Sequence, residues 1–127
     1  MASAHKESLL WIVAQGSTFG LEFQSLGIKC REVSLDAVGL FDMQELMTVL
    51  FQEGIRSLLV EGGARTYEPF INESLVNRIY LFQAPVLLKG AGRIPWFPVG
   101  GGDKDWLVKD VRLTNLDPDW LVEMDLP

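Results

Sequence analysis

The chain of 127 residues is 48% hydrophobic and 22% charged, a composition typical of a globular domain and not of a disordered segment. Its formal net charge of −6, without any basic run, argues against a nucleic-acid partner, because such partners bind clustered lysine and arginine. The mean hydropathy of +0.17 is high for so short a chain. Since small domains bury a modest share of their surface, we expect a second chain or a further segment to cover part of it.

Residues of special chemistry are few. Cys30 is the single cysteine and cannot form an internal disulfide, which together with the lack of a secretory signal predicts a cytoplasmic protein. His5 stands alone, without a cysteine or carboxylate at ligand spacing, so no metal site is predicted. The longest uncharged apolar run, residues 79–88, is far shorter than the ~20 residues that a membrane helix needs.

The first third of the chain predicts a strand, a helix and a strand. Residues 9–14 form a continuous apolar run that ends at Gln15-Gly16-Ser17, which is typical of a strand buried on both faces in a parallel sheet. Residues 19–26 predict a short helix, and Gly27 ends it. The mixed residues 28–33 favour an outer strand.

The element with the clearest sequence signals is a helix that begins after Asp42. Asp42 can serve as its N-cap, and Glu45, three residues later, completes a capping box. At the other end, Gly54 supplies a left-handed residue, and Ile55 can fold back onto Leu50 as in a Schellman ending. Residues 55–60 then predict a strand, and the order strand, helix, strand with short joints implies a parallel crossover unit.

Two glycines, Gly62 and Gly63, separate that strand from a helix predicted over residues 66–73. Pro69 must lie in the first turn of this helix or kink it. Glycines let a ligand approach the backbone closely, and a helix start presents unpaired N–H groups, so the pair is a candidate phosphate or pyrophosphate site. The alternative is a plain strand-to-helix turn, which spacing alone favours.

Glu61, at the carboxyl end of the predicted strand, also has two interpretations. Ligands of open α/β sheets bind at this end, where a carboxylate can accept hydrogen bonds from N–H groups of a heterocycle. Alternatively, Glu61 caps the following helix or pairs with Arg65.

The last third predicts strands around a loop. Residues 78–88 indicate a long strand, and residues 90–102, rich in glycine and proline, indicate a loop. Residues 106–113 and 120–126 predict two strands joined by a turn at residues 115–119. Because this hairpin is antiparallel, the sheet is expected to be mixed.

Nearly the whole chain, from about Leu9 to its end, resembles a known family, and the strong part of the resemblance runs from Gly54 to Gly92. The stretch Ser57-Leu58-Leu59-Val60-Glu61-Gly62-Gly63 is similar to the most recognisable motif of the riboflavin pyrimidine reductases. Residues 75–88, with Ala84-Pro85 and the later Gly90, look like the strand that follows in that family. The chain is therefore identified as a member of this family, in its reductase domain.

The resemblance implies a fold and a reaction. The expected fold is a single, partial dihydrofolate-reductase-like α/β domain over residues 1–127, truncated at its N-terminus. It is three-layered, with a mixed and mostly parallel sheet between helices and a C-terminal antiparallel hairpin. The reaction is hydride transfer from NADPH to a ribosylamino-pyrimidine phosphate, whose ribose becomes a ribityl chain. Position by position, the resemblance assigns Glu61 to the substrate and a run of cofactor-binding residues to the pyrophosphate: Gly62, Gly63, Ala64, Arg65 and Thr66. It also places residues 15–18 near the 2′-phosphate.

The sequence also departs from the family. Members begin with a strand and an Ala-Ser-Leu-Asp-Gly type segment that lines the nicotinamide, and this chain has no counterpart, so we expect it to lack a complete active site by itself. Asn77 replaces an acidic residue usual in the family. The alternative function is a degenerate nucleotide-binding or oligomerisation module of the same fold. In either case we expect a homodimer.

Overall fold

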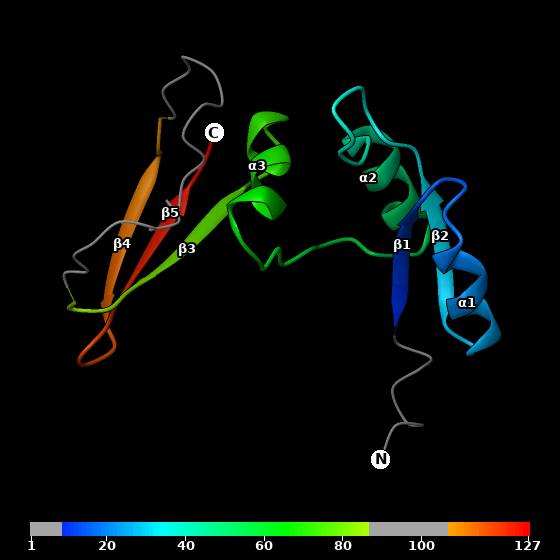
Figure 1. Ribbon diagram of the computed structural model, residues 1–127. Coiled ribbons are helices and arrows are strands. Elements are labelled where there is room, and N and C mark those ends of the chain that lie inside the picture. Colours follow the sequence, from blue (N-terminus) through cyan, green and yellow to red (C-terminus); the bar gives the residue numbers. More distant parts are fainter. Residues whose placement is uncertain (1–8, 87–106) are drawn as a thin grey trace. The chain divides into compact units, whose positions relative to one another are not determined.

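A computed structural model of the chain describes residues 9–86 and 107–127. The chain divides into two compact units, Met1–Leu59 and Val60–Pro127, which are taken in turn. Figure 1 shows their elements, in the order β1, α1, β2, α2 in the first unit and α3, β3, β4, β5 in the second. Within the described residues, no helix has the length and apolar character needed to cross a membrane.

The first unit is built on a parallel strand pair. β1 (Leu10–Ala14) and β2 (Lys29–Val33) pair in parallel from Leu10↔Lys29 to Ala14↔Val33, and α1 (Phe19–Ser25) connects them (Figure 1). These three elements are confirmed as predicted. The expectation that β1 is buried on both faces is wrong, because Trp11 is 41% exposed and rests with its ring 4.0 Å from that of Phe23. The single short helix α1 covers less of β1 than a complete layer of helices would.

The helix α2 (Met43–Gln52) begins at the predicted N-cap, but its capping box is only half formed. The Asp42 carboxylate accepts a hydrogen bond from the Glu45 N–H at 2.9 Å. Glu45 does not return the bond to Asp42. Its carboxylate accepts from the N–H of Ser34 at 2.8 Å and from the Ser34 hydroxyl, and these bonds lower the pKa of Glu45. The helix start is thereby tied to the chain that follows β2.

The end of α2 has the predicted Schellman geometry. The N–H of Ile55 donates to Leu50 O and the N–H of Gly54 donates to Phe51 O, both at 3.0 Å. Gly54 has a φ of 85°, the left-handed conformation that glycine adopts without steric cost. Both ends of α2 therefore rest on bonds between residues close in sequence. Its apolar side supplies half of the buried core residues of this unit, which are Val13, Cys30, Val33, Met43, Leu46 and Leu50.

The cap of α2 gives a first prediction. Replacing Asp42 with alanine removes the acceptor for the Glu45 N–H, so we expect a loss of about 1 kcal/mol in the free energy of unfolding. Asp42→Asn keeps an acceptor at the same place and should retain most of the stability. Urea unfolding of both variants measures the difference, and equal losses would show that the charge of Asp42 matters and its hydrogen bond does not.

The strand predicted over residues 55–60 is wrong. These residues form no β-ladder with any described strand, and Leu58 and Leu59 are 45% and 71% exposed. The predicted crossover between β2 and this segment is absent for the same reason, since a strand exists only through the backbone hydrogen bonds of a neighbour. The parallel crossover of this chain is β1–α1–β2.

The second unit holds one helix and an antiparallel sheet. α3 (Ala64–Asn72) starts two residues earlier than predicted, so Pro69 lies in its second turn and the carbonyl of Arg65 has no N–H partner there. β3 (Arg78–Gln83), β4 (Asp110–Asn115) and β5 (Trp120–Asp125) pair in the order β3-β5-β4 (Figure 1). The C-terminal hairpin is confirmed as β4 and β5. The predicted loop, residues 90–102, lies outside the described residues.

The three-stranded sheet is amphipathic, because side chains alternate between its faces along each strand. Register places Arg78, Asp125 and Asp110 in one row and Tyr80, Glu123 and Arg112 in the next. Arg78 forms an ion pair with Asp125, which lowers the pKa of that carboxyl. The opposite face carries apolar residues from all three strands, namely Ile79, Leu81, Val111, Leu113, Val122 and Met124. The mixed α/β class with a C-terminal antiparallel hairpin is thus confirmed.

Candidate functional site

The two glycines before α3 have different conformations and different surroundings. Gly62 has a φ of 147°, and a Cβ on it would lie 2.7 Å from the Thr66 Oγ1 and 2.9 Å from the Thr66 Cβ. Gly63 is the N-cap of α3, with φ −90° and ψ 177°, and a Cβ on it would meet no atom within 4 Å. Gly62 is therefore required by the fold, whereas the space beside Gly63 is open.

The start of α3 presents donors without acceptors. Its N-cap has no side-chain hydrogen bond and its first turn has no acidic residue. The Gly63 carbonyl accepts from the N–H of Thr66 at 2.8 Å, which closes the first turn. The N–H groups of Ala64 and Arg65 have no partner among the described residues, as expected at a helix start. With the positive end of the helix dipole, these groups suit an anion such as a phosphate.

The charged residues that flank the glycines add to this arrangement. Arg65 lies in the first turn of α3, is exposed, and forms no ion pair within the described part of the chain. Glu61 is exposed too, and it neither caps α3 nor pairs with Arg65. The structure therefore supports neither of the two structural roles considered for Glu61, as a helix cap or as an ion-pair partner of Arg65. Its carboxylate is open to a ligand, as is the guanidinium of Arg65.

Sequence patterns did not reveal the part that Thr66 plays beneath Gly62. Thr66 was assigned to the cofactor as a residue of the helix start, yet its side chain fills the place of a Gly62 Cβ. The signal that was available is the spacing, since residues i and i+4 meet across one helical turn. Gly62 and Thr66 thus form a packed unit that sets the direction in which α3 leaves the glycines.

Residues 15–18, expected near the 2′-phosphate, form the turn between β1 and α1. The N–H of Gln15 donates to Val33 O at 2.9 Å, and the N–H of Ser17 donates to Ala14 O at 3.0 Å. The Glu32 carboxylate accepts from the N–H of Gly16 at 3.5 Å, so a negative charge already lies beside this turn. That charge opposes a phosphate, and the turn offers weaker support for an anion than the start of α3.

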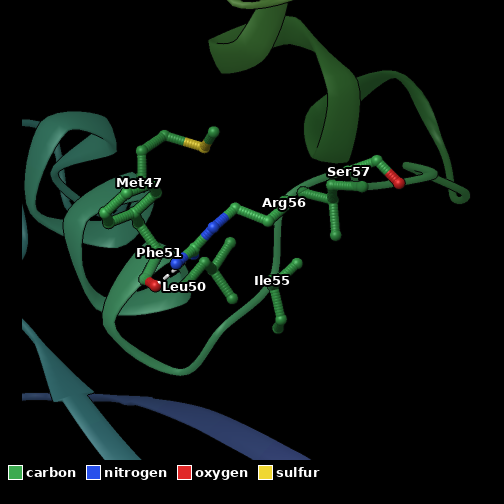
Figure 2. A pocket seen from close by; sticks show the side chains of 7 residues that line it. Met47, Leu50, Phe51, Ile55, Arg56 and Ser57 are labelled. Carbon is green, nitrogen blue, oxygen red and sulfur yellow. Dashed lines mark hydrogen bonds between the residues drawn. The ribbon is translucent and has the colours of Figure 1, made fainter.

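A pocket of ≈ 290 Å³ lies in the first unit, and none of the predicted site residues lines it (Figure 2). The end of α2 and the segment after it line this pocket, with Met47, Leu50, Phe51, Ile55, Arg56, Ser57 and Leu58. The Arg56 guanidinium lies 3.8 Å from the centre of the Phe51 ring and donates to Phe51 O at 2.6 Å, the bond dashed in Figure 2. Its charge is thus engaged by α2, and the pocket contains no acid or base.

Comparison with known proteins identifies related sequences. Residues 7–122 match the family described as the RibD C-terminal domain. The chain is 37% identical over 65 residues to the 2,5-diamino-6-ribosylamino-4(3H)-pyrimidinone 5′-phosphate reductase of Aquifex aeolicus (strain VF5), a match that covers 51% of this chain and 29% of that protein. It is 30% identical over 101 residues to riboflavin biosynthesis protein RibD of Bacillus amyloliquefaciens, covering 75% and 26%. The chain thus spans less than a third of these curated relatives.

Solved structures agree on the fold. Acinetobacter baumannii RibD, in its form 2, superposes on 98% of this chain with a TM-score of 0.69 and 21% sequence identity, and the match covers 32% of that protein. At this identity the likeness concerns the fold alone. It confirms the predicted dihydrofolate-reductase-like class.

Proposed function

Because the chain belongs to the RibD C-terminal domain family, we propose that it supplies the nucleotide-binding part of an NADPH-dependent pyrimidine reductase of riboflavin biosynthesis. The substrate is a ribosylamino-pyrimidine phosphate, and the product carries a ribityl chain. The observation that carries the proposal is the family match over residues 7–122, which includes the Glu61-Gly62-Gly63 motif. Since that match spans both compact units, we treat them as parts of one reductase-like domain.

The residues at the start of α3 fit the cofactor. When bound, NADPH supplies the hydride. The pyrophosphate would be held by the N–H groups of Gly63, Ala64 and Arg65, with Gly62 shaping the turn and Thr66 packed beneath it. The Arg65 guanidinium adds a positive charge to the same helix start. These groups would bind and orient the dianionic linker, and the first turn of α3 has no carboxylate that would repel it.

Glu61 is the residue that we assign to the substrate. Its carboxylate accepts hydrogen bonds, so it suits the N–H groups of a pyrimidine ring and would orient that ring beside the nucleotide. The assignment is supported by its place directly before the two glycines and by its lack of any ion pair within the described residues. We also propose that the working protein is cytoplasmic, since its single cysteine, Cys30, is free and buried. We further propose that it is a homodimer, since β4 exposes the apolar side chains of Val111 and Leu113.

Calorimetric titration of the purified chain tests the proposal. We expect NADPH to bind, and NADH, which lacks the 2′-phosphate, to bind more weakly. Hydride transfer requires the reacting carbons about 3–3.5 Å apart. Among the described residues only Glu61 is assigned to the substrate, so we expect no substrate-dependent oxidation of NADPH by this chain alone. Failure to bind either nucleotide would overturn the proposal and favour an oligomerisation module. Turnover would show that the chain completes an active site.

A further inference from the structure

Among the described residues the three-stranded sheet has two edge strands, β3 and β4, and β4 is the more exposed of the two. Within the described residues β4 pairs with β5 alone, and all six of its residues are exposed. Val111 and Leu113 are 57% and 66% exposed and belong to the apolar face of the sheet. A strand edge with exposed apolar side chains offers unpaired N–H and C=O groups to another strand.

The hydrogen-bond pattern shows which backbone groups face the free edge of β4. The N–H of Leu126 donates to Asn77 O, toward β3, so the alternate residues of β5, Asp125 and Glu123, direct their groups to β4. Their β4 partners, Asp110 and Arg112, direct N–H and C=O back toward β5. Val111, between them, therefore directs its N–H and C=O outward. Lys109 turns its N–H to Asp125 O at 2.8 Å, so the outward edge begins after it.

The charges along this edge are only partly balanced within the chain, since Arg112 lies opposite Glu123 on β5 whereas Asp110 has no cation opposite it. Asp110 lies directly opposite Asp125, a like charge, and forms no ion pair within the described residues. Arg112, two residues later on the same face, forms no ion pair within 4.0 Å either. One β4 strand thus carries a negative and a positive charge two residues apart, with Val111 at the midpoint.

From this arrangement we propose that β4 pairs with β4 of a second copy of the chain, antiparallel, about a two-fold axis through Val111. In that register Val111 lies opposite the partner's Val111, and their outward N–H and C=O groups form the two central hydrogen bonds. Asp110 lies opposite the partner's Arg112, and Arg112 opposite the partner's Asp110. Both ion pairs fall at positions that are not hydrogen-bonded, where cross-strand side chains come closest.

Symmetry and charge select this register. In a two-fold antiparallel pair some residue lies opposite its own copy. Centring on Asp110 or Arg112 would place like charges opposite each other, which is destabilising. Centring on Leu113 instead would place Arg112 opposite the partner's Thr114 and leave Asp110 without a cation. The Val111 register gives each Asp110 a cation opposite it and joins the apolar faces of the two sheets into one. The inference rests on the homodimer proposed above and adds its interface.

Charge reversal provides the test, with analytical ultracentrifugation as the measurement. Asp110→Arg makes the edge doubly positive and Arg112→Asp makes it doubly negative. Each variant alone turns two attractive pairs into repulsive ones, so we expect about 10- to 30-fold weaker self-association. Mixed together, the two variants form Arg–Asp pairs at both positions and should associate as a heterodimer. The double variant Asp110→Arg with Arg112→Asp should dimerise as the wild type does. Glu22→Arg, the same change in charge on α1, is the matched control and should leave dimerisation unchanged.

The outcomes separate this interface from the proposals on which it rests. A wild-type chain that stays at 14.2 kDa at every concentration overturns both the homodimer and its interface, whereas NADPH binding is measured independently. A dimeric wild type with equally dimeric single variants overturns only the interface. Heterodimerisation of the mixture supports the Val111 register and shows that both single variants fold. Single variants that dissociate and fail to combine when mixed overturn the register.

Discussion

Replacing Gly63 with valine is expected to abolish NADPH binding while leaving the chain folded. The backbone at Gly63 has φ −90°, which any residue can adopt, and a Cβ there meets no protein atom within 4 Å. The larger side chain would instead fill the open space at the start of α3, where we place the pyrophosphate. If two charge-assisted hydrogen bonds are lost, affinity should fall about 100-fold or more. Calorimetric titration with NADPH measures this change.

Thermal unfolding of the same variant supplies the control. Valine is a poorer N-cap residue than glycine, so a stability loss of up to about 1 kcal/mol is expected from helix capping alone. Gly63→Ala, with a smaller side chain, should give a lesser loss of affinity at nearly unchanged stability. If Gly63→Val binds NADPH as the wild type does, the assignment of the pyrophosphate to this helix start is wrong.

Replacing Gly62 with alanine should instead damage the fold. A φ of 147° is strained for any residue with a Cβ, at a cost of about 1–3 kcal/mol. The added Cβ would also lie 2.7 Å from the Thr66 Oγ1, so the first turn of α3 must shift. We expect Gly62→Ala to lower the free energy of unfolding by at least this strain cost. Gly63→Ala, one residue later, should leave the free energy of unfolding almost unchanged.

A double-mutant cycle separates strain from crowding at Gly62. Thr66→Gly removes the three side-chain atoms that would lie nearest to the new Cβ, although glycine in a helix itself costs about 1 kcal/mol. In the Thr66→Gly background, Gly62→Ala should lower the free energy of unfolding by a smaller amount. The loss that remains is due to the strained φ of residue 62. The same cost in both backgrounds would show that the contact with Thr66 does not contribute. Urea unfolding of the four proteins gives the coupling free energy.

Much of the candidate site was predictable from the sequence. Gly62 and Gly63 precede a helix as expected, and Glu61 and Arg65 flank them at the surface. The sequence did not reveal that the two glycines have different tasks. That difference depends on backbone angles and on the packing of Thr66, neither of which residue type alone specifies. The register that we propose for β4 was also hidden, because it depends on which residues face the outer edge of the sheet.

The sequence by itself determined the elements whose signals are local. α2 begins at Asp42 and ends at Gly54 because the bonds at both ends join residues three to five positions apart. The C-terminal hairpin likewise follows from two short strands separated by a turn. Such signals are carried by neighbouring residues, so they act before any distant part of the chain is in place.

Only the tertiary structure decided where distant groups meet. Residues 55–60 read as a buried strand, yet they have no strand partner among the described residues, and Leu59 is 71% exposed. Glu45 was expected to complete its own capping box and instead binds Ser34, eleven residues earlier. An apolar run specifies that a segment can pair or be buried, but pairing and burial require a neighbour, and chain topology alone brings that neighbour within reach.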